Sequence, residues 1–514
     1  MVNLPLVLIG LPGSGKSSAA KALGAMTGRP VFSIDAMIEA DAGKSIREIF
    51  EQEGERHFRR KETEFLVRVL ESEPTAIVDG GGGLVVGAEN RAALRARANT
   101  VWLDATDAEL VKRIGSASDR PLLAGDAVAD NLRSLRQDRL VHYTNAADAI
   151  VKTDNIVEAD VAQAVIVGAE GIKSRSANRR VETVKLDDGR GYPVVVGRGV
   201  IDELADFIPQ QAKRVAIVTQ AGIEIEVDSG RDQEVFVVED GERAKRLDVV
   251  GDLASRFAQW GMTRADCVVS VGGGVVSDLG GFVAASYHRG IPVVHVSTTL
   301  LGQIDAAIGG KCGVNLVEGK NLVGAFWQPS AVICDVDTLD TLPAREFRSG
   351  MGELAKYHFL GGGRLDEVEL VERVAVSARI KADVVSGDER EGGRRAILNY
   401  GHTLAHALET AGSYDLRHGE AVGIGLVYAA ELGHRLGRID SDRVAEHRRV
   451  VAGYGLSDQL PDGLDHEQII DLFSRDKKAI DGVTFVLDGE NGVETVPVDN
   501  RAVLLDALSA VAPK

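Results

Sequence analysis

Short apolar runs alternate with helical patterns along the first third of the chain. Residues 16–26 have helical periodicity, and apolar runs lie on either side of them, at residues 4–9, 76–78, 100–103 and 150–151. Apolar strands separated by helices are typical of a parallel sheet with crossover helices. The pattern therefore predicts an α/β domain over residues 1–170.

A basic stretch without periodicity separates this block from a second one. The stretch reads GIKSRSANRR at residues 171–180, and it predicts a linker over residues 171–181. Behind it, apolar runs again alternate with helical stretches, at residues 192–196, 215–219, 235–238, 267–271 and 293–296. We therefore expect a second α/β domain over residues 182–337.

Helical periodicity replaces most apolar runs beyond about residue 337. Helical patterns occupy residues 345–359, 365–381 and 420–436, and the main exception is an apolar run at 483–487. Apolar residues at helical spacing predict amphipathic helices. Residues 338–514 are therefore expected to form a mostly α-helical domain.

Composition and charge narrow the functional classes. Of the 514 residues, 44% are hydrophobic and 26% are charged, as in soluble folded proteins. The formal net charge of −18 repels nucleic acid and anionic membranes, so neither is an expected partner. We find no apolar run that could span a bilayer, no signal peptide features, and no CxxC spacing among the three cysteines. We therefore expect a cytoplasmic protein.

A phosphate-binding motif follows the first apolar run. Residues 10–17 read GLPGSGKS and match GxxxxGK[ST] between a predicted strand and a predicted helix. Glycines let backbone N–H groups converge on phosphates, Lys16 reaches the terminal phosphates, and the Ser17 hydroxyl binds Mg²⁺. The motif predicts a nucleotide site with Mg²⁺, formed by Gly13, Ser14, Gly15, Lys16, Ser17 and Ser18.

A second glycine-rich segment follows the apolar run at 267–271. Residues 272–281 read GGGVVSDLGG, and glycines after a strand let a pyrophosphate approach the backbone, as in dinucleotide-binding folds. The segment lacks the GxGxxG spacing. It therefore favours a dinucleotide site without establishing one.

Candidate metal ligands gather in the helical part. Glu353 and Lys356 are three positions apart and His402 and His406 are four apart, so each pair shares one helix face, and His418 follows a short turn. Two histidines and one glutamate with an open coordination position are typical of catalytic Zn²⁺, which polarises a substrate hydroxyl. Spacing alone leaves open whether His406 or His418 completes the site.

The first 165 residues resemble shikimate kinase. The resemblance rests on the phosphate loop followed by Asp35, residues 45–50 and 54–62, DGGGG at 79–83, RPLL at 120–123 and RLVHY at 139–143. It implies a P-loop kinase fold that phosphorylates shikimate with ATP. It also implies that Arg113 packs against the adenine, and that Asp35 and Arg120 are catalytic, with Arg120 on a mobile lid over the ATP. Shikimate would be held by Asp35, Arg59, Gly81, Gly82 and Arg139.

The chain departs from this family's pattern near Asp35. The family usually has two acids spaced Asp-x-Asp where this chain has Ser33-Ile34-Asp35. Asp79 stands just before the glycines, at a place where many P-loop enzymes keep a metal-orienting acid. We hypothesise that Asp79 replaces the missing carboxylate in support of the metal.

Residues from about 182 to about 490 resemble 3-dehydroquinate synthase. The matching segments include residues 240–245, 272–278, 298–315, 319–321, 353–356, 388–391, 395–406, 418–420 and 476–478. The resemblance implies a Rossmann-like NAD-binding domain followed by a helical metal-binding domain. It implies that 3-deoxy-D-arabino-heptulosonate 7-phosphate is cyclised to 3-dehydroquinate with loss of phosphate, and that NAD takes up and returns a hydride beside Zn²⁺ or Co²⁺.

This second resemblance also implies where the ligands lie. Zinc would be held by Glu353, His402 and His418. NAD would be held by Glu242, Lys245, Gly273, Gly274, Val275, Asp278, Thr298, Thr299 and Thr338. The sugar-acid phosphate would meet Arg289, Asp305, Lys311, Asn321, Lys356, Lys381, Arg395, Asn399, His406 and one of Lys477 and Lys478, and among these Lys311, Lys356, Arg395 and His406 would be catalytic. Arg289 would come from a neighbouring subunit, which implies a homodimer through the rear half.

Two alternatives remain open at this point. The rear half could be a related zinc- and NAD-dependent sugar-phosphate cyclase or a polyol dehydrogenase. The cluster of Lys311, Lys356, Lys381 and Arg395 suits a substrate with both phosphate and carboxylate, whereas a plain polyol needs none of them. One half could instead be a degenerate regulatory or scaffolding module, but that predicts a lost catalytic lysine or metal ligand, and the expected ones are present.

Overall fold

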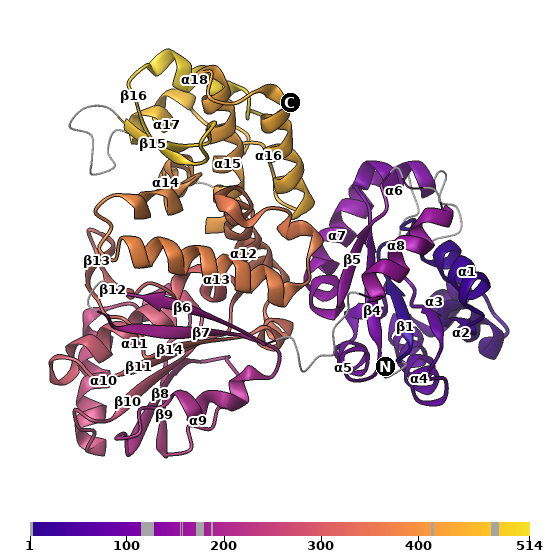
Figure 1. Cartoon of the computed structure of the whole chain (residues 1–514), viewed down its shortest axis with the longest axis horizontal. Coiled ribbons are helices and arrows are strands. Elements are labelled where there is room, and N and C mark those ends of the chain that lie inside the picture. The colour runs from indigo at the N-terminus through magenta and orange to yellow at the C-terminus, as the bar shows by residue number, and fades with distance from the viewer. Residues whose placement is uncertain are drawn as a thin grey trace. The chain divides into compact units, whose positions relative to one another are not determined.

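The chain forms two compact units, shown from indigo to yellow along the sequence in Figure 1. The computed structural model describes residues 4–114, 128–154, 156, 158–170, 179–186, 189–412, 416–473 and 483–513. The first unit spans residues 1–177 and the second spans residues 178–514, apart from a short segment at 367–370. Among the described residues, no helix has the length and hydropathy needed to cross a membrane.

A parallel sheet forms the centre of the first unit. Within the described residues it has five strands in the order β2-β3-β1-β4-β5, and every neighbouring pair is parallel. Because β1 lies in the middle, the loop that follows it opens at the carboxyl edge of the sheet, where ligands bind in such folds. The strands are β1 (Leu6–Ile9), β2 (Val31–Ser33), β3 (Ile77–Asp79), β4 (Asn99–Asp104) and β5 (Ala149–Lys152).

Helices cover this sheet, and the predicted helix at 16–26 is confirmed as α1. The four predicted strands are confirmed as β1, β3, β4 and β5. Strand β2 is not among the apolar runs of the sequence, because it has three residues and none of them is fully buried. The helices are α1 (Lys16–Thr27), α2 (Ile34–Ala42), α3 (Ile46–Glu53), α4 (Glu55–Ser72), α5 (Ala88–Arg97), α6 (Asp107–Ile114), α7 (Val128–Ala146) and α8 (Glu158–Glu170).

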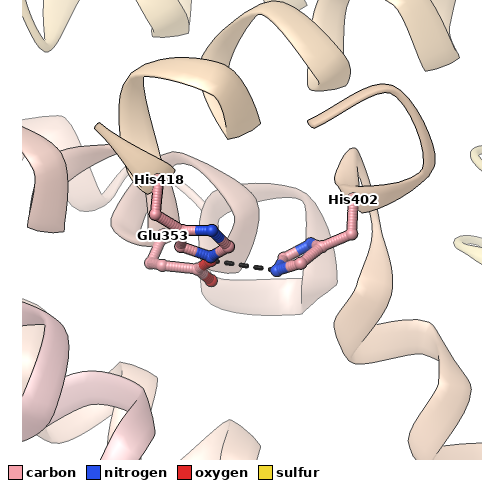
Figure 2. A group of neighbouring side chains, drawn as sticks. All are labelled: Glu353, His402 and His418. Atoms are coloured by element: carbon pink, nitrogen blue, oxygen red, sulfur yellow. Dashed lines mark hydrogen bonds and ion pairs between the residues drawn. The ribbon is translucent and has the colours of Figure 1, made fainter. Parts of the chain in front are cut away.

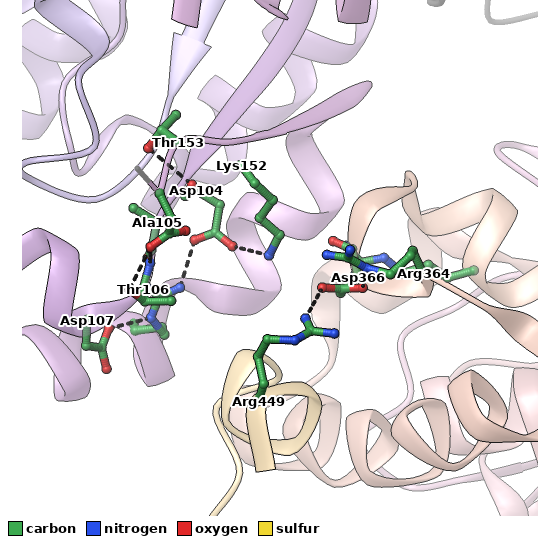
Figure 3. Close-up of polar contacts among 12 residues, drawn as sticks. Asp104, Ala105, Thr106, Asp107, Lys152, Thr153, Arg364, Asp366 and Arg449 are labelled. Carbon is green, nitrogen blue, oxygen red and sulfur yellow. Dashed lines mark hydrogen bonds and ion pairs between the residues drawn. The ribbon is translucent and has the colours of Figure 1, made fainter. Parts of the chain in front are cut away.

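A buried carboxylate ties together the carboxyl edge of this sheet. Asp104 ends β4 and accepts hydrogen bonds from Arg136 Nη1 and Lys152 Nζ, each at 2.8 Å (Figure 3). Burial opposes ionisation, but the Lys152 and Arg136 cations outweigh it and lower the pKa of Asp104 to about 2. Thr153, next to Lys152, donates to a carbonyl of the phosphate loop at 3.4 Å and accepts from Arg113 Nη1 at 3.1 Å. The ion cluster therefore also fixes the ends of the loops that surround the nucleotide motif.

A mostly parallel sheet forms the first part of the second unit. In the described ranges it has seven strands in the order β6-β7-β14-β11-β10-β8-β9, and only the edge pair β6 and β7 is antiparallel. Strands β10 and β11 are buried along their whole length, as expected for strands covered on both faces. The strands are β6 (Arg180–Lys185), β7 (Gly191–Gly197), β8 (Arg214–Gln220), β9 (Asp232–Val238), β10 (Cys267–Gly272), β11 (Val293–Ser297) and β14 (Ala331–Asp335).

The predicted strands of this block are confirmed as β7, β8, β9, β10 and β11. Strand β6 begins at Arg180, one residue before the expected end of the linker at 181, and residues 171–178 of that linker lie outside the described residues. A π-helical turn at Gly302–Ala306 leads to a hairpin that the apolar pattern did not predict. The remaining elements of this part are α9 (Leu204–Phe207), α10 (Leu247–Trp260), α11 (Gly274–Ser286), β12 (Lys311–Leu316) and β13 (Gly319–Phe326).

The rest of the second unit is mostly helical and lies beside the sheet, in orange to yellow in Figure 1. Helix α15 is buried along most of its length and packs against α12, α14, α16 and α18, so it forms the centre of this part. The predicted helices are confirmed as α12, α13 and α15, and the apolar run at 483–487 is confirmed as β15. The elements are α12 (Ala344–Tyr357), α13 (Leu370–Gly387), α14 (His402–Ala411), α15 (His418–Arg435), α16 (Ser441–Gly453), α17 (His466–Phe473), β15 (Val483–Leu487), β16 (Glu494–Val498) and α18 (Arg501–Ser509).

Three glycine contacts set the spacing of α12, α14 and α15. A Cβ atom on Gly419 would lie 1.6 Å from Ser349 O, and one on Gly352 would lie 2.0 Å from Gly419 O. A Cβ atom on Gly425 would lie 1.9 Å from Gly401 O. These distances leave no room for any side chain, so only glycine lets the three backbones touch.

Replacing Gly425 by alanine is expected to lower the stability of the second unit by about 1–3 kcal/mol, because the new methyl group must push two packed backbones apart. Gly433→Ala, on the same helix as Gly425, is the matched control. A Cβ atom on Gly433 would lie 3.7 Å from Asp488 O, which is an ordinary van der Waals distance. The midpoint of urea unfolding of the second unit is measured for both variants. Equal midpoints for the two variants would show that the contact at Gly425 is not needed.

Candidate functional sites

The phosphate motif lies between β1 and α1, as its sequence predicts. Gly13 and Gly15 have φ of +85° and +93°, which only glycine adopts readily, and α1 begins directly afterwards at Lys16. Lys16 Nζ donates to Gly10 O at 2.9 Å and to Leu11 O at 3.1 Å. A helix N-terminus and a lysine at a glycine loop form a site for phosphate groups.

Two acids lie next to this loop at the carboxyl ends of β2 and β3. Ser17 Oγ donates a hydrogen bond to Asp79 Oδ2 at 2.5 Å. Asp35 lies in the first turn of α2. Burial and the neighbouring Asp79 carboxylate raise the pKa of Asp35, while the Lys16 cation opposes them. A raised pKa makes the Asp35 carboxylate a stronger base than an ordinary aspartate.

The glycine run at 80–83 brings the expected acceptor-binding residues together. A Cβ atom on Gly81 would lie 2.9 Å from Asp35 Oδ1, and φ at this glycine is +65°. Arg139 Nη1 donates to Gly82 O at 2.7 Å. The run therefore passes between an acid and an arginine that come from α2 and α7.

Glu62 is a residue at this site to which the sequence analysis gave no role. Arg59 Nη1 donates to Glu62 Oε2 at 2.9 Å, and a Cβ atom on Gly83 would lie 2.2 Å from Arg59 Nη1. Burial raises the pKa of Glu62 to about 7, although Arg59 opposes this. The sequence feature that could have identified Glu62 is its position three residues after Arg59 on the same helix.

The structure describes only one of the two arginines that were expected at the nucleotide site. Arg113 lies on α6, where its guanidinium donates to Glu109 Oε1 at 2.9 Å and to Thr153 Oγ1 at 3.1 Å. Arg120 lies outside the described residues.

In the second unit, the expected dinucleotide residues meet at the carboxyl edge of β10 and β11. Helix α11 begins at Gly274, two residues after the end of β10. A Cβ atom on Gly273 would lie 2.8 Å from Thr299 Cγ2, and Thr298 N donates to Gly272 O at 3.0 Å. A pyrophosphate can therefore approach the backbone at this edge, next to a helix N-terminus.

A buried lysine joins the remaining dinucleotide residues. Lys245 Nζ donates to Asp278 Oδ2 and to Asn321 Oδ1, each at 2.6 Å. Glu242 lies three residues before Lys245 and accepts from Asn315 Nδ2 at 2.8 Å. The hairpin β12–β13, which carries both asparagines, is thus tied to this side of the sheet.

Thr338, also expected at the dinucleotide site, is buried within the fold. Its hydroxyl donates to Asp335 O at 2.6 Å and accepts from Gln303 Nε2 at 3.3 Å.

Glu353, His402 and His418 form a candidate metal site (Figure 2). One ligand atom from each lies within 4.8 Å of the others, and His402 Nε2 and His418 Nε2 lie 3.2 Å and 3.1 Å from Glu353 Oε1. His406 is exposed on α14, with its ring 5.5 Å from that of His402 and 6.5 Å from that of His418. Of the two histidines that spacing left open, the geometry places His418 in the group.

The hydrogen bonds around this group favour the binding of a cation. His402 Nδ1 lies 3.2 Å from Tyr400 O, and His418 Nδ1 lies 2.9 Å from Glu409 Oε1. These acceptors require a proton on each Nδ1, so a neutral ring turns the lone pair of its Nε2 toward Glu353. Two nitrogen lone pairs and a carboxylate oxygen thus converge on one place, which fits Zn²⁺ or Co²⁺.

The sequence pattern gave Glu409 no role, although this residue lies seven positions after His402 on the same helix. Burial opposes the charge on His418, but hydrogen bonds to Glu353 and Glu409 outweigh it and raise its pKa to about 10. Carboxylates that bond to the second nitrogen of a ligating histidine orient the ring and increase its basicity.

A buried ion cluster lies next to the metal site. Lys356 Nζ lies 3.2 Å from Asp305 Oδ2 and also pairs with Glu353, and Lys356 is fully buried. Lys381 donates to both the carboxylate and the backbone carbonyl of Asp305. Asp305 comes from the π-helical turn, a form of helix that is frequent at functional sites. The cluster can therefore present two lysines to an anionic ligand beside the metal.

The other expected substrate residues lie around the start of β12 and the turn at Arg394–Asn399. Lys311 Nζ pairs with Glu391 Oε2 at 2.7 Å, and Asn399 also bonds to Glu391. Arg395 donates to Gly309 O at 3.0 Å and to a carbonyl in the loop before it.

Arg289 is exposed, with φ of +66°, in the turn after α11. Lys477 and Lys478 lie outside the described residues.

Three family models match the chain in sequence. Shikimate kinase matches residues 12–169, 3-dehydroquinate synthase N-terminal matches residues 235–349, and 3-dehydroquinate synthase C-terminal matches residues 350–479. The matches confirm the prediction that both enzymes are present in one chain.

Relatives with similar sequences match the second unit. A protein of Amycolatopsis mediterranei (strain S699), named "Putative aminodehydroquinate synthase", is 48% identical over 62% of this chain and 91% of its own length. The 3-dehydroquinate synthase of Thermobifida fusca (strain YX) is 45% identical over 52% of this chain and 78% of its own length. The family of the rear half is therefore shown.

Solved structures show a similar fold for the second unit. The 2-deoxy-scyllo-inosose synthase with carbaglucose-6-phosphate, NAD⁺ and Co²⁺ is 24% identical, with a TM-score of 0.58 over 65% of this chain and all of that one. The 2-epi-5-epi-valiolone synthase of Streptomyces hygroscopicus subsp. jinggangensis 5008, with NAD⁺ and Zn²⁺, is 26% identical, with a TM-score of 0.54 over 62% of this chain and 96% of that one.

The expected fold class is confirmed for the P-loop kinase domain and for the dinucleotide and helical parts behind it. The alternatives of a related sugar-phosphate cyclase, a polyol dehydrogenase or a degenerate module are not favoured, since all three models match and the expected metal ligands lie together. The chain belongs to the 3-dehydroquinate synthase family and carries a shikimate kinase domain in front of the synthase.

Proposed function

We propose that Glu353, His402 and His418 hold the catalytic metal of the synthase, and that the lysines around Asp305 receive its substrate. The observation that carries the proposal is the convergence of two imidazole nitrogens and one carboxylate beside a buried lysine. The chain is a bifunctional enzyme of the shikimate pathway, so these groups act on a sugar-acid phosphate. The proposed substrate is 3-deoxy-D-arabino-heptulosonate 7-phosphate and the product is 3-dehydroquinate.

The synthase residues divide their tasks by charge. Glu353, His402 and His418 would hold a metal that, when bound, would polarise a ring hydroxyl, while bound NAD⁺ would supply hydride-transfer chemistry at the same carbon. Lys356 and Lys381, held by Asp305, attract the anionic groups of the substrate and keep the reactive conformer in place. Lys311, Arg395 and Asn399 would exchange their bonds to Glu391 and to backbone carbonyls for bonds to substrate. His406 is exposed beside the candidate metal ligands, and we propose that it exchanges protons with the substrate.

The residues proposed for NAD lie at the carboxyl edge of the second sheet. Glu242, Lys245 and Asp278 are joined by the Lys245 ion pair, and Gly273, Gly274 and Val275 open the helix at which the pyrophosphate is expected. Thr298 and Thr299 face the same glycines, and we assign Thr338 to the floor of this site.

In the kinase domain, the phosphate loop holds ATP and the glycine run faces shikimate. Lys16 would leave the carbonyls of the loop for the terminal phosphates. Arg59 and Arg139 are proposed to bind the shikimate carboxylate in the paired geometry that guanidinium favours. Asp35, whose pKa is raised by burial, would accept the proton of the attacking hydroxyl.

We propose domain boundaries that follow the sequence analysis: a kinase domain over residues 1–170, a linker, an NAD-binding domain over 182–337 and a helical domain over 338–514. They are supported by the division near residue 177 and by the end of the sheet at β14.

We also propose a homodimer in the cytoplasm. The exposed Arg289, in a backbone conformation that is strained for a non-glycine residue, is available to the substrate of a second copy. The proposed kinase activity consumes ATP, which the cytoplasm supplies, and this supports the proposed location.

An assay of both activities on the purified chain tests this function. ADP formation from ATP and shikimate is measured in excess Mg²⁺, and phosphate release is measured with catalytic NAD⁺, each before and after a chelator. We expect the chelator to abolish phosphate release, Zn²⁺ or Co²⁺ to restore it, and ADP formation to survive. A need for stoichiometric NAD⁺, or no phosphate release at all, would contradict the proposal for the rear half.

The identity of the Amycolatopsis relative gives a second candidate substrate for the same site, an amino analogue of the sugar-acid phosphate. Comparison of kcat/KM for the two substrates decides between them. We expect kcat/KM to be higher for 3-deoxy-D-arabino-heptulosonate 7-phosphate than for its amino analogue.

Glu409→Gln is expected to weaken Zn²⁺ binding about 10- to 100-fold, because the carboxylate that orients His418 is lost. Competition with a chromogenic chelator measures the affinity, and ADP formation should be unchanged. The exposed Glu226→Gln serves as a control for the loss of one acid. Equal Zn²⁺ affinity in the two variants would rule out an orienting role for Glu409.

The proposed role of Lys381 predicts a pH dependence. Burial lowers the pKa of Lys381 to about 8, although Asp305 opposes this, so its charge is lost as the pH rises through that value. We expect kcat/KM for phosphate release to fall about tenfold for each further pH unit. Lys381→Arg keeps its charge to about pH 12 and should move the fall to higher pH. A flat profile between about pH 7 and 9.5 would be inconsistent with the proposed role.

A further inference from the structure

A carboxylate lies against the metal-binding hydroxyl of the phosphate loop. Ser17 Oγ donates a hydrogen bond to Asp79 Oδ2 at 2.5 Å, and Asp79 is only 7% exposed. Because the hydrogen of this hydroxyl points at Asp79, the lone pairs of Ser17 Oγ turn away from the carboxylate and can face a cation. The hydrogen bond therefore sets the hydroxyl in the orientation that a metal ligand needs.

Ser33 and Asp79 occupy equivalent places on adjacent strands. β2 ends at Ser33 and β3 ends at Asp79, and the two residues are direct partners in the parallel register. Register partners point to the same face of a sheet from strands about 4.8 Å apart. An acid at the end of either strand would therefore reach the same region beside the phosphate loop.

Ser33 has a separate local role. Its hydroxyl accepts from Ala36 N at 3.5 Å and caps the N-terminus of α2. Aspartate is an equally good capping residue, so this cap does not require a serine. The position on β2 tolerates an acid, but the chain has its acid on β3 instead.

We propose that Asp79, together with Ser17, holds the Mg²⁺ of the nucleotide in the kinase domain. The inference rests on the proposed kinase function and deepens it. Mg²⁺ in such sites usually keeps several waters and is bound by one or two carboxylates with the substrate phosphates. Ser17 bonds to Oδ2 of Asp79, which leaves Oδ1 to accept a hydrogen bond from a metal-bound water. Asp79 supplies from β3 the charge that Ser33 does not supply from β2.

Nucleotide-dependent Mn²⁺ binding tests this assignment without relying on turnover. The full chain is first loaded with Zn²⁺ at the rear site, and free Mn²⁺ is then followed by electron paramagnetic resonance with and without ADP. Asp79→Asn keeps an oxygen that accepts from Ser17 but removes the charge. We expect it to weaken ADP-dependent Mn²⁺ binding at least tenfold while ADP affinity without divalent metal is unchanged.

The double variant Ser33→Asp with Asp79→Asn is the matched rescue. Because the two positions are register partners, the moved carboxylate should restore Mn²⁺ affinity to within a few-fold of the unaltered chain. Unchanged Mn²⁺ binding in Asp79→Asn, or no recovery in the double variant, would overturn the proposal. If the unaltered chain fails to bind ADP or to phosphorylate shikimate, it is the kinase function that fails.

A second measurement does not depend on the folding of any variant. In crystals of the unaltered chain grown with Mn²⁺ and ADP, the Mn²⁺ anomalous peak is expected within bonding distance of Ser17 Oγ and one water away from Asp79. A peak on Asp35 with Asp79 farther away would also overturn the proposal.

Discussion

The synthase half depends on the close approach of three helix backbones at glycines. Gly352 lies next to Glu353, Gly401 next to His402 and Gly419 next to His418, so each proposed metal ligand adjoins a residue whose missing side chain lets the helices touch. Side chains of ordinary length can then converge within one coordination sphere. The packing that stabilises the helical part and the geometry of the metal site therefore have the same origin.

Most of the charged side chains proposed to bind substrate are opposite in sign to the net charge of the chain. The chain as a whole carries a net charge of −18, yet its proposed substrates are anions. Two of the cations that would bind them, Lys356 and Lys381, are buried with the acid partner Asp305. Burial makes each charge costly alone and strong when paired, so these groups are held rigidly before any substrate arrives. The kinase domain follows the same rule with Arg59 on Glu62.

Most candidate site residues were implied by the two family resemblances. Sequence patterns alone predicted the long buried strands, the long helices, the phosphate loop and the candidate metal ligands, because these have strong periodicity or distinctive spacing. They did not predict β2, which is short and half-exposed, or the hairpin β12–β13, whose exposed residues give no continuous apolar run. They also gave no role to Glu62, Glu391 and Glu409, since a carboxylate that orients another side chain looks like any surface acid until the fold places it. Spacing left the choice between His406 and His418 open, the family resemblance implied His418, and the three-dimensional geometry groups His418 with Glu353 and His402.

The most direct test of this account is the position of the metal in the second unit. Crystals of the chain loaded with NAD⁺ and Zn²⁺ should give one anomalous peak at the zinc edge, about 2.0–2.2 Å from a carboxylate oxygen of Glu353 and from Nε2 of both His402 and His418. A peak bound by His406 in place of His418, or no peak among these helices while phosphate release persists, would contradict it.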